Sequence, residues 1–236
     1  TIIGLGYVGL PLAVQFVIND KCRYSNNKLD YRVIGFDINS KRVEELKKGY
    51  DSTQEIDQKV LRSIKNIKFT TNAKDIENSD VYIVTVPTPI DNNNNPDMKP
   101  LKLASKTIGD ALKNRLLKHN KSELSLPIII YESTVYPGAT EEICIPIIEK
   151  KTKLIANKDF FYGYSPERIN PGDKQHQLKK IKKIVSGSNI YAQKIIKRLY
   201  ESIILAGVHV APSVKIAEAA KVIENIQRDI NVAFSN

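Results

Sequence analysis

The first nine residues, Thr1-Ile-Ile-Gly-Leu-Gly-Tyr-Val-Gly9, restrict the fold of this chain more than any other stretch. Two β-branched residues run into three glycines and an apolar stretch follows, which predicts a strand, a tight turn and a helix start. The first glycine would make the bend, the second would leave room for a pyrophosphate, and the third would let helix and strand pack closely. The residues predicted to contact a dinucleotide are Gly4, Gly6, Tyr7, Val8 and Gly9. A glycine-rich turn without a ligand is the alternative.

The apolar pattern of the remaining chain predicts a covered parallel sheet. The uninterrupted runs 81–86 and 127–131 indicate strands buried on both faces. Further strands are predicted at 32–36, 67–71, 160–164, 184–186 and 208–210, and helices at 9–19, 40–49, 54–65, 102–118, 139–150 and 190–202. Ser40 is expected to cap its helix and Gly49 to end it. We predict an α/β fold: a Rossmann-like doubly wound, mostly parallel sheet over 1–206, followed by the start of a long central helix in 207–236.

Asp37 closes the second predicted strand, where an acidic side chain binds the adenosine ribose hydroxyls and repels a 2′-phosphate. The cofactor predicted from this residue is NAD rather than NADP. Gly9 and Asp37 lie 28 positions apart, against about 20 in the usual pattern, and the polar loop 20–31 accounts for the excess. A solvated aspartate at a strand end is the alternative interpretation.

Loops at the carboxyl ends of parallel strands form the ligand crevice of an open sheet. Asp37, Thr88 and Thr134 each follow a predicted strand, so we expect them at that edge. The loop 165–173, Ser-Pro-Glu-Arg-Ile-Asn-Pro-Gly-Asp, follows another strand and combines turn residues with charged and amide side chains. It either presents these side chains to a ligand or is a solvated connector.

Pro212 and Ser213 open a long predicted helix with two contrasting faces. Its apolar residues, spaced alternately by three and four, are Ile216, Ala219, Ile223, Ile226, Ile230 and Ala233. Its polar residues are Glu218, Lys221, Asn225 and Arg228. The apolar spacing suits packing against another helix, so a homodimer or an interdomain contact is one interpretation, with the polar face at the crevice. A surface helix with one wet face is the other.

Composition excludes several classes of protein. The chain has 42% hydrophobic and 26% charged residues, as globular proteins do, and no run approaches the roughly 18 apolar residues of a membrane span. Its two cysteines have neither metal nor redox spacing, so we predict no metal site and a cytoplasmic location. The net charge of +10 suits anionic ligands, while the lysine cluster 179–183 lacks the aromatics of a nucleic-acid module. The short first strand and the uncapped last helix predict a piece of a longer protein.

Five motifs, in order along nearly the whole chain, resemble the UDP-glucose/GDP-mannose dehydrogenases, a family of nucleotide-sugar 6-dehydrogenases. The motifs are Gly-Leu-Gly-Tyr-Val-Gly-Leu-Pro-Leu-Ala (4–13), Val-Pro-Thr-Pro (86–89), Glu-Ser-Thr-Val-Tyr-Pro-Gly-Ala-Thr (132–140), Ser-Pro-Glu-Arg-Ile-Asn-Pro-Gly (165–172) and Ala-Glu-Ala-Ala-Lys-Val-Ile-Glu-Asn (217–225). Segments 165–173 and 224–231 are more similar to the branch that acts on UDP-N-acetylhexosamines. The resemblance implies oxidation of a sugar C6 alcohol to a carboxylate by two NAD in succession, for cell-surface polysaccharide biosynthesis. UDP-GlcNAc, UDP-GalNAc, UDP-ManNAc and UDP-glucose all remain open as the substrate.

The resemblance also implies roles for single residues. Glu167 would sit beside C6 and assist thioester hydrolysis, with Thr134 holding the water. Lys221 and Asn225 would bind the C6 oxygen as it gains negative charge. The implied substrate contacts are Glu167, Arg168, Asn170, Lys221 and Asn225. The implied NAD contacts are Gly4, Gly6, Tyr7, Val8, Gly9, Asp37, Arg42, Thr88 and Thr134.

By the same resemblance, the nucleophilic cysteine and its aspartate partner are expected beyond residue 236. Cys144 falls among isoleucines in mid-helix and Cys22 in the loop after the first helix, so neither is expected to replace that cysteine. The chain alone is expected to bind NAD weakly and not to turn over. Two alternatives stay open: another Rossmann dehydrogenase of the 3-hydroxyacid or phosphogluconate type, and a non-catalytic NAD-binding or nucleic-acid-binding module.

Overall fold

The computed structural model of the chain describes every residue except 20, 23, 24, 26, 30, 92, 94, 120–124, 168–180 and 236. Its strands are β1 (Ile2–Ile3), β2 (Val33–Phe36), β3 (Ile67–Thr70), β4 (Val81–Val84), β5 (Ile128–Tyr131), β6 (Phe161–Tyr164), β7 (Lys183–Gly187) and β8 (Val208–Val210). Its helices are α1 (Gly9–Ile18), α2 (Ser40–Lys47), α3 (Gln58–Ser63), α4 (Lys99–Lys118), α5 (Ile145–Thr152), α6 (Ile190–Glu201) and α7 (Val214–Ser235), with a 3₁₀ turn η1 (Ala73–Ile76) and a π-helical turn η3 (Thr140–Cys144).

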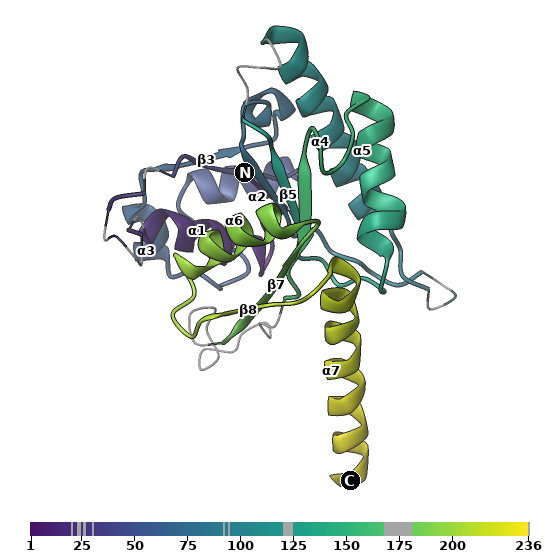
Figure 1. The fold of residues 1–236 in the computed structure, drawn as a ribbon. Coiled ribbons are helices and arrows are strands. Elements are labelled where there is room, and N and C mark those ends of the chain that lie inside the picture. Colours follow the sequence, from purple (N-terminus) through teal and green to yellow (C-terminus); the bar gives the residue numbers. More distant parts are fainter. Residues whose placement is uncertain are drawn as a thin grey trace.

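These strands form one sheet in the order β3-β2-β1-β4-β5-β6-β7-β8 (Figure 1). From β3 to β6 all neighbours pair in parallel, which is the Rossmann order. β7 then runs antiparallel to β6, and β8 runs parallel to β7. The predicted α/β, doubly wound and mostly parallel sheet is confirmed.

Both faces of the sheet are buried, as the unbroken apolar runs predicted. Along β5, Ile128 and Ile130 belong to one core cluster, and Ile129 and Tyr131 belong to the other. Helices α1, α2 and α6 cover the first face, and α4 and α5 cover the second. Because successive side chains point to opposite faces of a strand, such a run is stable only with cover on both sides.

Local hydrogen bonds set some helix boundaries differently from the prediction. Asn39 caps α2, because its side chain accepts a hydrogen bond from the backbone N–H of Arg42. The prediction that Ser40 is the cap is therefore wrong, since Ser40 is the first helical residue. Gly49, with a φ of +72°, follows the end of α2 as expected. Asp57 caps the next helix at Gln58, so α3 is shorter than the predicted 54–65.

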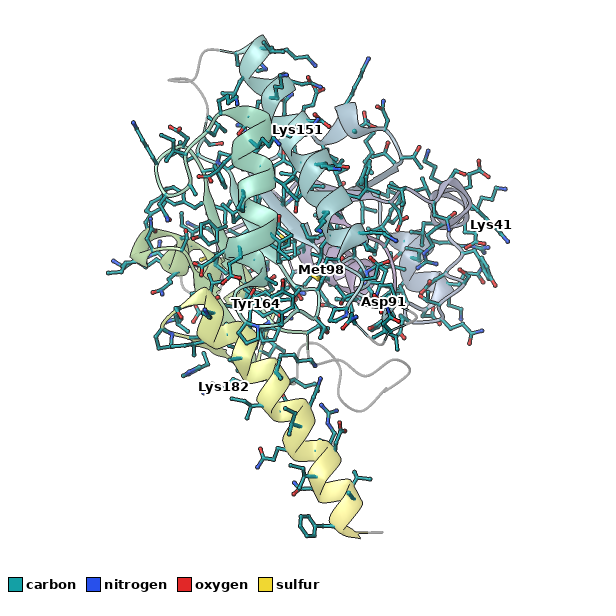
Figure 2. The ribbon with its side chains drawn as sticks, turned by 90° about the vertical axis from the view of Figure 1, so that its right-hand side faces the viewer. Lys41, Asp91, Met98, Lys151, Tyr164 and Lys182 are labelled. Carbon is teal, nitrogen blue, oxygen red and sulfur yellow. The ribbon has the colours of Figure 1, made fainter. Side chains whose placement is uncertain are left out.

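Helix α7 projects from the domain, and its first turns are the part packed onto it (Figure 1). Val214, Ala217 and Glu218 are buried there, at the same end of the domain as Tyr164 and Met98 (Figure 2). The Glu218 carboxylate accepts hydrogen bonds from the backbone N–H groups of Gly138 and Thr140, at 2.5 and 3.0 Å. A buried carboxylate thus caps the turn η3 and fixes where α7 leaves the sheet.

The predicted apolar stripe of α7 lies in solvent in this chain. Ile216, Ile223, Ile226 and Ile230 are all at least half exposed. A homodimer or an interdomain contact through this stripe stays a prediction, as does the division of the chain at residues 206 and 207. Among the described helices, none combines the length and the apolar character needed to cross a membrane.

We expect Glu218→Ala to lower the free energy of unfolding by about 3 kcal/mol, because two buried N–H groups lose their acceptor at about 1–3 kcal/mol each. Urea denaturation followed by circular dichroism measures this change. The control is Lys215→Ala on the same helix. Its Nζ lies 3.9 Å from Glu142 Oε1 with both side chains exposed, so the change should stay within about 0.5 kcal/mol. Equal effects of the two variants would contradict the role of Glu218.

Candidate functional site

The turn between β1 and α1 uses its three glycines in three different ways. Gly4 has a φ of +94°, and a Cβ there would lie 3.0 Å from the carbonyl oxygen of Thr85. A Cβ on Gly9 would lie 1.9 Å from the carbonyl oxygen of Gly4, so helix and strand are in direct contact. A Cβ on Gly6 would meet nothing within 4 Å. The second glycine therefore faces open space, as a phosphate approach requires.

The backbone N–H and carbonyl groups of Leu5 in this turn are both hydrogen-bonded to side chains. Its N–H donates to Asp37 Oδ2 at 2.8 Å, and its carbonyl oxygen accepts from Arg42 Nε at 2.8 Å. The Arg42 guanidinium is buried and also pairs with Asp51 at 2.8 Å. These bonds fix the turn to the end of β2 and the start of α2. The described contacts of Arg42 lie within the protein, and its predicted contact with NAD stays a prediction.

A cavity of about 790 Å³ opens at the carboxyl edge of the parallel strands, a size typical of ligand sites. It brings together eight of the residues predicted from sequence: Gly4, Gly6, Tyr7, Val8, Asp37, Thr88, Thr134 and Glu167. Thr88 Oγ1 donates to the carbonyl oxygen of Thr134 at 2.6 Å, which ties the loop after β4 to the loop after β5. The glycine turn and the Glu167 loop therefore share one crevice.

Glu167 belongs to a buried charged group that we call the Lys183 cluster: Glu132, Glu167, Lys183 and Tyr200. Lys183 Nζ lies 2.7 Å from Glu132 Oε2 and 3.2 Å from Glu167 Oε2. The Tyr200 hydroxyl donates to the other oxygen of Glu132. All four side chains are at least nine-tenths buried by residue or side-chain exposure, and the residues Glu132 and Glu167 are among those that line the cavity.

Burial and mutual charge shift the ionisation of this cluster. Burial raises the pKa of Glu132 to about 7, the Lys183 ammonium opposes this rise, and the Glu167 carboxylate adds to it. Burial alone would lower the pKa of Lys183, but the two carboxylates outweigh it and hold that pKa above its ordinary value. The lysine is thus charged at neutral pH. It lies between Glu167, at the cavity wall, and Glu132, whose carboxyl group titrates near neutrality.

Lys221 and Asn225 lie on α7, and neither is among the residues that line the cavity. Burial lowers the pKa of the half-buried Lys221, opposed by the carboxylates of Glu224 and Glu167. Asn225 Oδ1 accepts from the Arg228 guanidinium at 2.7 Å. Arg168 and Asn170 lie outside the described residues.

Three residues of the Lys183 cluster were missed from sequence. Glu132 ends an apolar run, which is a signal of a strand end, but nothing in its spacing indicates a partner. Lys183 is hidden in a stretch rich in lysines, and Tyr200 reads as an ordinary core residue of an amphipathic helix. Only the antiparallel pairing of β7 with β6 brings them together.

Neither cysteine lies at the cavity. Cys144 is buried in the helical segment that begins after Gly138, and burial raises its thiol pKa to about 11, so it is not a thiolate at neutral pH. Cys22 follows α1 and is half-buried.

The fold and the cavity define a dinucleotide-binding Rossmann domain. The residues present fit a dinucleotide, because Gly6 leaves open space and Val8, at the start of α1, offers no side-chain cap to the helix N–H groups. Residues 1–204 match the UDP-glucose/GDP-mannose dehydrogenase family, NAD binding domain. The chain belongs to this family, and NAD is its cofactor.

Two curated relatives are identical to this chain at about half of the aligned positions. A UDP-N-acetyl-D-glucosamine 6-dehydrogenase from Pseudomonas aeruginosa is 52% identical and Protein CapL from Staphylococcus aureus 50% identical, each over 235 residues. Each match covers all of this chain and 50% of the relative, so the chain spans about half the length of these proteins.

A solved structure of a UDP-D-ManNAc dehydrogenase from Pyrococcus horikoshii has a TM-score of 0.82 and 29% identity, over 99% of this chain and 51% of that one. A ternary complex of GDP-mannose dehydrogenase from Pseudomonas aeruginosa, at 22% identity, has a TM-score of 0.83 over 100% and 51%. This second likeness shows the fold alone.

Gly6→Ala and Gly9→Ala should separate binding from folding. We expect Gly6→Ala to keep the wild-type free energy of unfolding and to raise the Kd for NAD about tenfold or more, because the methyl group fills the phosphate approach. Gly9→Ala should lower the free energy of unfolding by about 1–3 kcal/mol, because its methyl group overlaps the Gly4 carbonyl oxygen. Calorimetric titration and urea denaturation measure the two effects. Wild-type NAD affinity in Gly6→Ala would contradict this assignment.

Proposed function

We propose that this chain forms the NAD-binding half of an enzyme that oxidises the C6 alcohol of a UDP-sugar to the uronic acid, for cell-surface polysaccharide biosynthesis. The substrate class is UDP-N-acetylhexosamine or UDP-glucose. The observation that carries the proposal is the single crevice shared by the glycine turn and Glu167. Two relatives that are 52% and 49% identical to the chain are UDP-N-acetyl-D-glucosamine 6-dehydrogenases, which supports the same class of substrate.

The chain's own residues would orient the dinucleotide. Its pyrophosphate would lie over Gly6 at the start of α1, and Asp37 would accept the ribose hydroxyls. The Asp37 carboxylate already accepts the N–H groups of Leu5 and Asn39 at 2.8 and 2.9 Å, so it is fixed in place as a negative charge that disfavours a 2′-phosphate. Thr88 and Thr134 would border the nicotinamide end. When bound, NAD supplies a hydride acceptor.

Lys221 and Asn225 would stabilise the C6 oxygen as it loses its proton and gains charge. They lie one helical turn apart on α7, so both side chains project from one face. Burial, which lowers the pKa of Lys221, brings its ammonium closer to the range in which it can exchange a proton. The Glu218 bonds that fix the first turns of α7 also set the position of this pair.

Glu167 would accept a proton from the water that hydrolyses the acyl intermediate, with Thr134 holding that water. The positive charge of Lys183 beside it favours the ionised carboxylate that a base needs. Arg168 and Asn170 would contact the sugar nucleotide. The nucleophilic thiol would come from the part of the family's chain that this sequence does not span, because Cys144 and Cys22 lie away from the cavity. We therefore propose that the chain alone does not turn over, and that the enzyme is a cytoplasmic homodimer joined through α7.

A fusion of this chain to the C-terminal half of the Pseudomonas aeruginosa relative tests the function. We expect the fusion to form two NADH for each UDP-GlcNAc or UDP-GalNAc consumed, because alcohol to carboxylate is a four-electron oxidation. The chain alone should form none. Lys221→Ala in the fusion should lower kcat about a hundredfold or more, as loss of a stabilising donor does. Lys118→Ala, a surface variant on α4, should leave kcat unchanged. NADH formation by the chain alone, or none by a folded fusion, would contradict the proposal.

A further inference from the structure

The Lys183 cluster contains one cation that interacts with two carboxylates and with an aromatic ring. Lys183 makes bonds to two carboxylates at once, and its Nζ lies 5.7 Å from the centre of the Tyr200 ring. Glu132 and Glu167 line the cavity, whereas Lys183 and Tyr200 lie behind them. A single ammonium therefore bonds to Glu167 at the cavity wall and to the fully buried carboxylate of Glu132.

The strand register explains why Lys183 reaches Glu167. Gly163 pairs with Gly187 and Tyr164 with Ser186, so each step forward from β6 corresponds to a step back along β7. The Ser165 hydroxyl donates to the Ile184 carbonyl oxygen at 2.7 Å, so the two segments stay adjacent beyond the ladder. Continued to the next positions, this register places Glu167 opposite Lys183. An antiparallel strand begins where its parallel neighbours end, which is the edge that holds the cavity.

Stability alone does not account for this arrangement. Removing an ammonium and two carboxylates from water costs several kcal/mol for each ion, and apolar side chains of similar volume are often equally or more stabilising. The strands β5 and β7, which flank β6, are largely buried, so apolar side chains in place of these charges would pack there as well. Charged groups at such a place, with Glu167 at the wall of a ligand cavity, point to a requirement of the cavity.

We propose that Lys183 is a positioning residue for Glu167: it holds the Glu167 carboxylate in its charged form at the cavity wall, while Glu132 and Tyr200 hold Lys183 from behind. This inference rests on the catalytic role proposed for Glu167. Both carboxylates interact with the same ammonium. Protonation of one carboxylate therefore strengthens the attraction between Lys183 and the other, and the two carboxylates titrate as a coupled pair. The titratable groups that face the cluster are Glu132 after β5, Tyr164 and Glu167 on and after β6, Lys183 on β7, Tyr200 on α6 and Lys221 on α7.

Carboxyl ¹³C NMR of the chain labelled at glutamate tests the coupling, with Glu167→Gln and Glu132→Gln assigning the two signals. In the wild-type chain we expect Glu132 to titrate with a pKa near 7. Glu167→Gln should lower that pKa, because a neighbouring negative charge is lost. Lys183→Met should raise it by about one unit or more, because the opposing positive charge is lost. Lys183→Arg should keep it near the wild-type value.

Lys183→Met leaves two buried carboxylates without a cation, which can unfold the chain. A double variant that also removes one of the carboxylates avoids this. Lys183→Met combined with Glu132→Gln removes the positive charge of Lys183 and the negative charge of Glu132 together. Relative to Glu132→Gln alone, the Glu167 signal should then titrate about one unit higher or more. Lys118→Met is the matched control, because it removes the lysine paired with the buried carboxylate of Glu77 on the far part of the sheet. It should move neither signal, and unchanged titration in the Lys183 variants would overturn the inference.

A kinetic readout separates positioning from a structural role. In the fusion enzyme, Lys183→Met should move the acidic limb of the kcat profile to higher pH, because Glu167 then ionises only at higher pH, and Lys183→Arg should restore it. Loss of folded enzyme would lower kcat at every pH without moving that limb, and this outcome would overturn the inference. If the wild-type fusion forms no NADH, the proposed function fails, and the titrations of the chain still decide the role of Lys183.

Discussion

The common direction of the strands from β3 to β6 determines where everything in this site lies. Parallel strands end at the same edge of a sheet, so the glycine turn after β1, Asp37 after β2 and the loops after β4, β5 and β6 meet there. β7 then reverses direction, and its first residue, Lys183, comes to that same edge. The position of the cavity follows from the common direction of β3 to β6, and the buried positive charge of Lys183 comes from β7, which runs the opposite way.

Two sets of buried polar bonds make this edge rigid. Asp37 accepts a hydrogen bond from the Leu5 N–H group and Arg42 donates one to the Leu5 carbonyl oxygen. Hydrogen bonds to charged groups contribute about 1.5–3 kcal/mol each. Glu218 does the equivalent for α7 through the N–H groups of Gly138 and Thr140. The glycine turn and the helix that carries Lys221 are therefore both held to the domain by buried hydrogen bonds. Such preorganisation is what electrostatic stabilisation of a developing charge requires.

The fold and much of the cavity wall could be predicted from the sequence, whereas Glu132 in that wall and Lys183 beside it could not. Unbroken runs such as 127–131 identify covered parallel strands because burial on both faces removes any alternation. The positions of Asp37, Thr88 and Thr134 then follow from topology alone. Helix caps were less predictable, because Asn39 and Ser40 are both good capping residues in adjacent positions, and the local hydrogen bond from the Arg42 N–H to Asn39 marks the one that is used. The antiparallel direction of β7 has no sequence signal, so the pairing of Lys183 with Glu132 and Glu167 could not be predicted.

We propose that one crevice holds the dinucleotide and presents its reactive end to Glu167. A crystal structure of the chain grown with NAD is the measurement that tests this placement. We predict the adenosine ribose at Asp37, the pyrophosphate over Gly6, and the nicotinamide between the Thr134 loop and Glu167. NAD bound outside this cavity, or with its nicotinamide directed away from Glu167, would contradict the account.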